Sequence, residues 1–133
     1  MQHNNTYKKP ERIKSRKQVE KLFKQGKSFN QYPFKLYFLQ EQEAAGVKAG
    51  VAVSARNFKN ATDRNRIKRQ MREAYRITND VLKKYAAENS LQVLVFFLYV
   101  DKTMPDYSII KTKMQQAINR LVKELHETAT KNS

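Results

Sequence analysis

The chain has 133 residues, which fits one compact domain with a single hydrophobic core. Hydrophobic residues make up 40% of it, including seven Phe and seven Tyr, and this content argues against wholesale disorder. Lys and Arg number 27 against 12 Asp and Glu, so the formal net charge is +15. A domain this basic repels itself unless a polyanion is close, so nucleic acid is the leading partner and an anionic membrane surface the second.

Cysteine is absent, which excludes disulfides, thiolate zinc sites and cysteine nucleophiles. The first five residues contain no apolar stretch of the kind found in signal peptides. The longest apolar run, Leu91 to Val100, is roughly half the length needed to cross a bilayer. We therefore expect a soluble, cytoplasmic protein with no membrane partner.

The N-terminal part of the chain predicts a tail followed by a short helix. Residues 1–11 are polar and basic, and we expect a flexible basic tail there, with a single RNA-binding domain over residues 12–128. Ser15, followed by Gln18, has the capping-box spacing and predicts a helix over about 15–25. Gly26 then follows as a left-handed stop.

Two strands are predicted next. The segment Phe34–Leu39 is rich in β-forming residues, with Phe34, Leu36 and Phe38 on one face and Lys35, Tyr37 and Leu39 on the other. The segment Val47–Val53 alternates apolar residues with small or polar ones. A short strand over Ser28–Gln31 is a further possibility ahead of these two.

The segment from Arg64 to about Tyr85 has the clearest helical period. Its apolar side chains fall in a stripe roughly 120° wide, which must pack on the sheet. The stripe consists of Ile67, Met71, Ala74, Tyr75, Thr78, Val81, Leu82 and Tyr85. Asn60, Thr62 and Asp63 lie just upstream, and each can cap the helix.

The C-terminal part predicts a buried strand and a last helix. Leu91–Val100 is almost continuously apolar, as expected of a central strand, and its aromatic run Phe96–Tyr99 is interpreted as core. After Pro105, a helix is predicted from about Tyr107 to Thr128. Its buried face consists of Ile110, Met114, Ala117, Ile118, Leu121 and Leu125. The order of helix, two or three strands, helix, strand, helix indicates one α+β domain.

The long predicted helix begins with a dense basic run. Its candidate RNA-binding residues are Arg64, Asn65, Arg66, Lys68, Arg69, Arg72 and Arg76. Positive charges at a helix N-terminus oppose one another and the helix dipole, so helix stability alone does not explain them. A solvated basic face is the alternative, but arginine's planar fork suits bidentate phosphate contacts, whereas a solubilising face could equally be lysine. We interpret the helix as a surface that binds nucleic-acid backbones.

The run Arg64–Arg69 at the start of a long helix resembles the signature of the bacterial ribonuclease P protein family. The similarity extends over about residues 12–125. It includes the segments Arg12–Lys14, Phe23–Ser28, Phe34–Tyr37, Gly50–Ser54 and Arg56–Asp63. The resemblance implies a single-domain α-β-β-β-α-β-α sandwich with a mostly antiparallel four-stranded sheet, ribosomal protein S5 domain 2-like. It also implies a left-handed β-α-β crossover, where composition alone would favour the right-handed form.

The resemblance also implies a function. In that family a large RNA is the catalyst, and the protein is the subunit of ribonuclease P that assists endonucleolytic removal of the 5′ leader from precursor tRNA. The basic helix would bind the catalytic RNA, and a cleft between the first helix and the sheet would hold the leader. The implied cleft residues are Arg12, Lys14, Phe23, Lys35, Tyr37, Ser54, Arg56, Lys59 and Asn60. For Tyr37, packing under the first helix is the alternative to a role in stacking on bases. For Phe23, the alternatives are a core anchor and a wall of the cleft, and the two are compatible.

Two positions depart from the family pattern. Val19 stands where an aromatic residue is common, and Ala55–Arg56 stands where two consecutive basic residues are common. Both positions belong to the implied leader cleft, so we expect them to affect the strength of leader binding rather than the binding of the catalytic RNA.

The chain offers no set of residues for cutting RNA by itself. Asp63, Glu73, Asp80 and Glu88 are spaced too irregularly for one face, and His3 and His126 lie near the two ends. We expect no catalytic residue, no metal ligand and no required protein partner in this chain, with Mg²⁺ required by the RNA-catalysed reaction. A ribosomal or ribosome-assembly protein and a membrane-surface protein are the alternative readings.

Overall fold

The computed structural model describes residues 7–13, 15–42 and 45–131, with side chains as far as residue 127. Its elements, in chain order, are η1 (Lys9–Glu11), α1 (Arg16–Gln25), β1 (Lys27–Gln31), β2 (Phe34–Glu41), β3 (Gly46–Val53), α2 (Ala61–Thr78), α3 (Asp80–Glu88), β4 (Gln92–Tyr99) and α4 (Tyr107–Lys131). The predicted order of elements is confirmed, including the short strand before β2. The structure adds the 3-10 helix η1 and divides the long predicted helix in two.

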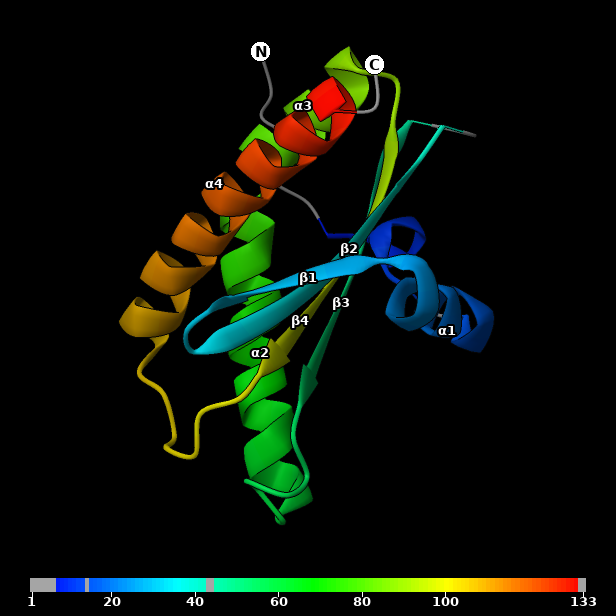
Figure 1. The fold of residues 1–133 in the computed structure, drawn as a ribbon. Helices are drawn as coiled ribbons and strands as arrows, with labels where there is room; N and C mark the ends of the chain where they lie inside the picture. The colour runs from blue at the N-terminus through cyan, green and yellow to red at the C-terminus, as the bar shows by residue number, and fades with distance from the viewer. Residues whose placement is uncertain (1–6, 14, 43–44, 132–133) are drawn as a thin grey trace.

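The four strands form one mixed sheet in the order β1-β2-β4-β3 (Figure 1). The pairs β1–β2 and β2–β4 are antiparallel, and β3–β4 is parallel. The predicted α+β fold with a mostly antiparallel sheet is therefore confirmed, and β4 is the central strand that its apolar run indicated.

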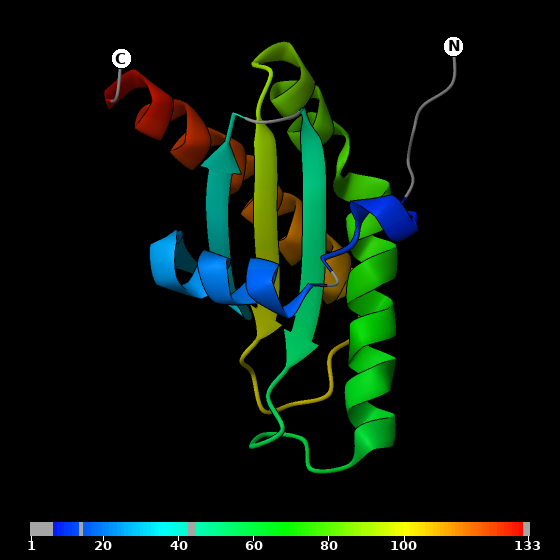
Figure 2. The ribbon, with the colours of Figure 1, turned by 90° about the vertical axis from the view of Figure 1, so that its right-hand side faces the viewer.

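The connection between the parallel strands β3 and β4 is left-handed. Figure 2 shows both strands pointing downwards, with β4 (yellow-green) to the left of β3 (teal). The connecting helices α2 and α3 lie on the side of the sheet opposite α1, which crosses in front in that view. The chain therefore passes from β3 leftwards to β4, and its connecting helices lie behind the sheet. This arrangement is a left-handed crossover, the rare form of the connection between parallel strands.

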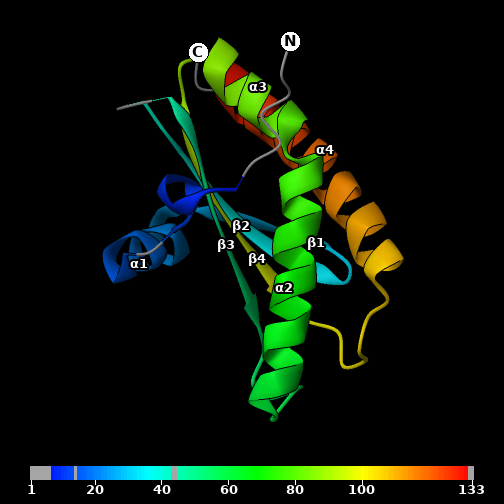
Figure 3. The ribbon, with the colours of Figure 1, turned by 180° about the vertical axis from the view of Figure 1, so that it is seen from behind.

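The two faces of the sheet have different cover. Helices α2, α3 and α4 pack on one face, and α1 crosses part of the other (Figures 1 and 3). On the covered face, Val93, Val95 and Phe97 of β4 are fully buried. The predicted face of α4 is buried too, as all of Ile110, Met114, Ala117, Ile118, Leu121 and Leu125 have no exposed surface. One continuous core therefore lies between the sheet and this layer of helices.

Helix α1 begins at its predicted cap, but it ends by a different mechanism from the one predicted. The Ser15 side chain accepts a hydrogen bond from the Lys17 amide at 3.1 Å. Gly26 is extended, with φ −78° and ψ 170°, so the predicted left-handed stop is wrong. Glycine is required there by close packing, because a Cβ atom would lie 2.4 Å from the Leu22 carbonyl oxygen and 2.7 Å from that of Phe38.

The long predicted helix is broken at Asn79. This residue ends α2 and caps α3, and its side chain is fully buried. The break changes the direction of the helical face that follows it (Figure 3). As a result Val81 is 45% exposed, and its predicted place in the buried stripe is wrong, while Tyr75 and Leu82 are buried as predicted.

The N-terminal segment packs on the domain from residue 7 onwards. Tyr7 is buried, its hydroxyl donates to the Ala49 carbonyl oxygen, and its ring meets the Tyr75 ring of α2 edge-on at 5.0 Å. The Ile13 amide donates to the same Ala49 carbonyl at 3.0 Å. The prediction of a flexible tail is therefore wrong for residues 7–11, and residues 1–6 lie outside the described part of the chain.

This packing predicts a measurable loss of stability when the Tyr7 ring is removed. Tyr7→Ala should lower the free energy of unfolding by about 3 kcal/mol, because it empties a buried aromatic site. Lys8→Ala is the matched control on an exposed neighbour and should change the free energy by less than about 0.5 kcal/mol. Urea unfolding followed by circular dichroism measures both variants. Equal stability of the two variants would show that the segment is a loose tail.

Candidate nucleic-acid interface

The basic helix α2 begins one turn earlier than predicted because Asn60 caps it. The Asn60 side chain accepts a hydrogen bond from the Thr62 amide at 3.1 Å, and the helix starts at Ala61. Thr62 and Asp63, the other candidate caps, lie in the first turn. Asn60 was assigned to the leader cleft from the sequence, but its side-chain oxygen is occupied by this capping bond.

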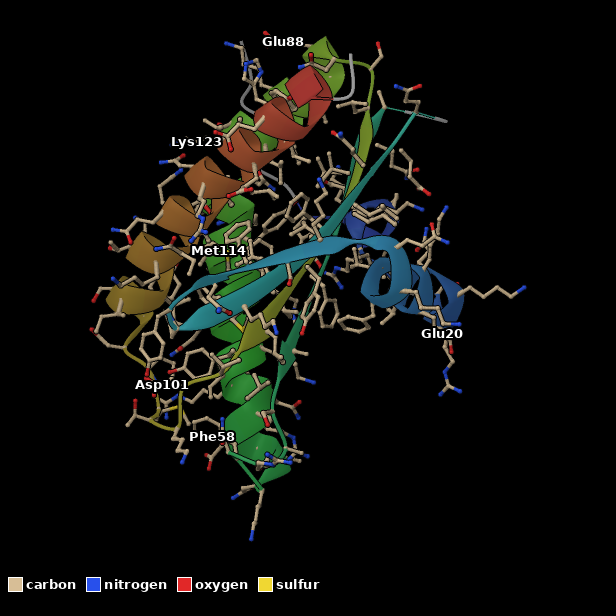
Figure 4. The ribbon with its side chains drawn as sticks, in the orientation of Figure 1. Glu20, Phe58, Glu88, Asp101, Met114 and Lys123 are labelled. Carbon is tan, nitrogen blue, oxygen red and sulfur yellow. The ribbon has the colours of Figure 1, made fainter. Side chains whose placement is uncertain are left out.

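Arg64 has a structural role in the described conformation. Its guanidinium donates to the carbonyl oxygens of Phe58 at 2.7 Å and Lys59 at 2.9 Å. Phe58 is buried at the base of α2 (Figure 4), and its ring lies 6.2 Å from that of Tyr99. Arg64 thus ties the loop before α2 to the first turn of the helix, which positions the basic residues that follow.

The remaining basic residues of α2 lie on its solvent side. Asn65, Arg66 and Arg69 are exposed, and Lys68 and Arg72 are half-buried. Arg76 forms an ion pair with Glu73 at 2.6 Å, and this hydrogen bond holds the pKa of the Glu73 carboxyl below its usual value. We call the residues Asn65, Arg66, Lys68, Arg69 and Arg72 the α2 basic face. Figure 3 shows no other helix or strand in front of α2, which agrees with the exposure of Asn65, Arg66 and Arg69.

A second surface lies on the other side of the sheet, beside α1. The strand registers place Tyr37 of β2 opposite Phe96 of β4, and Phe96 opposite Gly50 of β3. In the next row of the same face, Lys35 lies opposite Leu98. We call the Tyr37–Phe96–Gly50 and Lys35–Leu98 rows the open sheet face, because α1 covers only part of this side of the sheet (Figure 2).

Three aromatic rings meet on the open sheet face. The Phe23 ring of α1 stands edge-on to Tyr37 at 4.6 Å and to Phe96 at 5.6 Å. Phe23 is nevertheless 47% exposed, and the Lys35 ammonium lies 5.4 Å from the centre of the Tyr37 ring. Phe23 therefore packs against the sheet and is still open to solvent, so its two alternatives, core anchor and cleft wall, are compatible.

Phe96 was assigned to the core from the sequence, and this assignment is wrong. Phe97 and Tyr99 of the same run do point into the core, but Phe96 is half-buried on the open sheet face. It lies flat against β3 because position 50 is glycine, where a Cβ atom would come within 2.8 Å of the ring. The strand's two-residue period is the signal that could have found it, since Phe96 shares a face with Leu94 and Leu98.

The loop between β3 and α2 connects the two surfaces. The Ser54 hydroxyl oxygen accepts a hydrogen bond from the Arg56 amide at 3.2 Å, and the Asn57 side chain donates to the Val100 carbonyl oxygen at 3.1 Å. Arg56 and Lys59, two of the predicted cleft residues, are exposed on this loop. They place positive charge between the α2 basic face and the open sheet face.

Of the two predicted cleft residues before α1, the structure places Arg12 and does not describe Lys14. Arg12 lies at the outer edge of β3, where its backbone pairs with Ala49 and its guanidinium lies 5.0 Å from the Tyr7 ring centre. Burial raises the pKa of the Tyr7 hydroxyl to about 12, so this ring stays neutral beside the arginine. Lys14 lies outside the described residues.

The described side chains offer no metal cluster. Across residues 7–13, 15–42 and 45–127, no group of three His, Asp or Glu side chains is close enough to hold a metal ion. His126 is exposed on α4, and His3 lies outside the described residues. In the same part of the chain, the helices are too short or too polar to cross a lipid bilayer.

Comparison with known proteins decides the family. The family model for ribonuclease P matches residues 7–125. A ribonuclease P protein component from Porphyromonas gingivalis is 31% identical over 126 residues, which cover 93% of this chain and 92% of the relative. The chain belongs to the ribonuclease P protein family.

Membership of the ribonuclease P family gives the chain its place in an enzyme. It is a protein subunit of the ribonucleoprotein endoribonuclease that acts in tRNA 5′ processing. A ribonuclease P protein component from Listeria innocua is 41% identical over a shorter stretch of 68 residues, 51% of this chain and 56% of the relative. The ribosomal alternative is not favoured by these relationships.

Solved structures show the same fold. A Staphylococcus aureus RNase P protein mutant, described as having defective mRNA degradation activity, matches with a TM-score of 0.64 at 24% identity, covering 86% of this chain and 90% of that one. The RNase P protein from Thermotoga maritima matches with a TM-score of 0.60 at 23% identity, covering 83% and 96%. The predicted fold class is therefore confirmed by both the architecture and these neighbours.

Proposed function

We propose that the α2 basic face binds the catalytic RNA of ribonuclease P and that the open sheet face binds the 5′ leader of precursor tRNA. The observation that carries the proposal is the separation of two chemically different surfaces by one sheet. One surface is a helix face rich in arginine, and the other is a set of partly exposed aromatic rings with a lysine beside them. Each suits a different form of RNA.

The α2 basic face suits a folded RNA because folded RNA presents closely spaced phosphates. Arg66 and Arg69 are exposed, and the planar guanidinium can contact two phosphate oxygens at once. The buried side of the same helix, with Ile67 and Met71 fully buried, fixes the direction of these arginines. A rigid charged face gains affinity mainly through the release of counterions, without reading the sequence of the RNA.

The open sheet face suits a single strand. Proteins bind unpaired nucleotides by stacking the bases on aromatic side chains and by placing cations along the backbone. Phe23, Tyr37 and Phe96 provide the rings, and Lys35 provides a cation beside them. Because stacking tolerates any base, this surface fits a leader whose sequence differs from one precursor to the next.

The chain's contribution to the reaction would then be binding, orientation and charge. Contacts with the leader favour the precursor over the mature product, which lacks those nucleotides. Positive charge on both surfaces reduces the repulsion between two RNA molecules and lowers the Mg²⁺ concentration at which they associate. We propose that the Mg²⁺ ions of the reaction are held by the catalytic RNA and its substrate, and that the ribonucleoprotein works in the cytoplasm.

The first test removes two arginines from the α2 basic face. Arg66→Ala combined with Arg69→Ala should weaken binding to the cognate catalytic RNA by roughly tenfold or more, and reduce the slope of log affinity against log salt by roughly two units at most. The matched control is Lys84→Ala with Lys123→Ala, which removes the same charge from exposed positions on α3 and α4. Filter binding over a range of salt concentrations measures both pairs. Equal slopes for the two pairs would refute the assignment of α2.

The second test moves Phe96 without touching any charge. Gly50→Ala forces a methyl group against the Phe96 ring and should cost about 1–3 kcal/mol of stability. It should also reduce the preference of the holoenzyme for precursor over mature tRNA by roughly tenfold, since stacking on an aromatic ring is worth about 1–3 kcal/mol per base.

The control for this test is Ile118→Val, a core change on α4 that lowers stability by about 0.5–1.5 kcal/mol and leaves the open sheet face intact. Binding of precursor and mature tRNA is compared for both variants at a temperature where each is folded. An unchanged preference in Gly50→Ala would contradict leader binding on this face.

A further inference from the structure

A third basic region lies at the outer edge of β3, beside η1 and the start of α1. A hollow of about 470 Å³ opens between η1, the outer edge of β3 and the first turns of α1. It is lined by Lys9, Pro10, Arg12, Ser15, Gln18 and Lys48. The N-terminal segment contributes two of the cations, Lys9 and Arg12, and β3 contributes the third, Lys48, to the same small space.

The charge of this hollow is unbalanced. Its lining residues, in the described part of the chain, include no Asp or Glu. Glu11, the acid nearest in sequence, forms an ion pair with Lys83 of α3. Bringing like charges together costs free energy in the folded protein, and a bound anion removes that cost.

The hollow is also built from fixed parts. The Arg12 guanidinium donates to the Tyr7 carbonyl oxygen at 3.3 Å and lies over the Tyr7 ring, and the Arg12 backbone pairs with Ala49. Lys48 is half-buried on β3, between the buried residues Val47 and Ala49 that point to the opposite face. The contacts of Arg12 hold its guanidinium in place before any ligand arrives, which lowers the entropy cost of binding.

The polar side chains in the hollow complete a set of hydrogen-bond donors. The Ser15 hydroxyl oxygen accepts a bond from the Lys17 amide, so its own hydrogen can be directed to a ligand. Gln18 carries an amide group that donates two hydrogen bonds. Two ammonium groups, one guanidinium, a hydroxyl and an amide form a set that matches the oxygens of a phosphate group.

The position of the hollow indicates an RNA backbone as the carrier of such a phosphate. Arg12 lies over the Tyr7 ring, and that ring contacts Tyr75 on α2. On the other side, α1 runs from Ser15 to the Phe23 ring on the open sheet face. Figure 2 shows η1 beside α2 at the end of α1. A strand of RNA that passes from α2 to α1 along the outer edge of β3 would therefore meet the hollow.

We propose that the hollow formed by Lys9, Arg12 and Lys48 is a binding site for one phosphate group of an RNA backbone. This proposal rests on the proposed function, and it joins the α2 basic face and the open sheet face into one path for RNA. The phosphate comes either from the leader of the precursor or from the catalytic RNA, and the two sources share the same chemistry.

The test uses two single substitutions in the hollow. Lys48→Gln and Lys9→Gln each remove one charge and keep a polar side chain, one methylene shorter than lysine. Lys123→Gln removes the same charge from the exposed side of α4 (Figure 4). Two affinities are measured over a range of salt: that of the protein for the catalytic RNA, and that of the holoenzyme for precursor relative to mature tRNA.

Both hollow variants should weaken one of these affinities by roughly threefold to tenfold and reduce its salt slope by roughly one unit at most, while Lys123→Gln leaves it unchanged. A loss in catalytic-RNA binding assigns the phosphate to that RNA, and a loss confined to the precursor assigns it to the leader. If both variants behave like Lys123→Gln in both measurements, the site is refuted. Lys9 is exposed on η1, so Lys9→Gln tests the phosphate site by itself if Lys48→Gln does not fold.

A direct probe completes the test. Titration of the full chain with inorganic phosphate, followed by amide NMR, should shift the Arg12 and Lys48 signals in the unaltered protein and shift them less in Lys9→Gln. The absence of any shift there would overturn the site. If the hollow variants keep their affinity for RNA and the α2 double variant loses affinity, the phosphate site is refuted and the proposed function stands. No loss in either set would refute the proposed function as well.

Discussion

The position of β4 in the middle of the sheet determines which side chains appear on each face of the molecule. This strand pairs with β2 on one side and β3 on the other, so its backbone hydrogen bonds are satisfied and its side chains alternate strictly between two faces. Val93, Val95 and Phe97 enter the core, and Phe96 and Leu98 enter the opposite face. A shift of one residue in this register would bury the aromatic surface and expose the core.

The two faces of the sheet then acquire different roles through their cover. Three helices seal the core face, and the basic side of α2 is the outer surface of that layer. Helix α1 leaves part of the other face open, with Phe23 at the boundary. The positive charges at the start of α2 repel one another and oppose the helix dipole. The helix tolerates this because its buried stripe packs in the core, and because Asn60 and Arg64 fix its first turn. An RNA partner supplies the opposite charge that the protein lacks.

Local patterns predicted most of the fold because periodicity and capping are local properties. The faces of β2 and α4 and the cap of α1 all follow from spacing along the chain. Two features depend on contacts between distant residues, and spacing cannot reveal them. Asn79 breaks the long helix because its side chain is buried in the core, and Tyr7 is ordered by Ala49, 42 residues away. The left-handed crossover was expected only from family resemblance.

The candidate site was predictable to a similar extent. The exposed arginines of α2 follow from the helical wheel, because they lie opposite the apolar stripe. The roles of Arg64 and Asn60 in fixing the loop could not be separated from RNA binding, since a basic or polar side chain at a helix start suits either purpose. Phe96 was hidden in a continuous apolar run, in which hydrophobicity alone does not show which residues face outwards.

The most direct test of the division between the two surfaces is a map of the RNA near each one. The chain contains no cysteine, so a single cysteine at Thr62 on α2 or at Asn30 on β1 can carry a tethered iron chelate that cleaves nearby RNA with hydroxyl radicals. In the complete complex with precursor tRNA, the Thr62→Cys probe should cut the catalytic RNA, and the Asn30→Cys probe should cut the 5′ leader. Cuts in the same nucleotides from both positions, or leader cuts from α2 alone, would contradict the account.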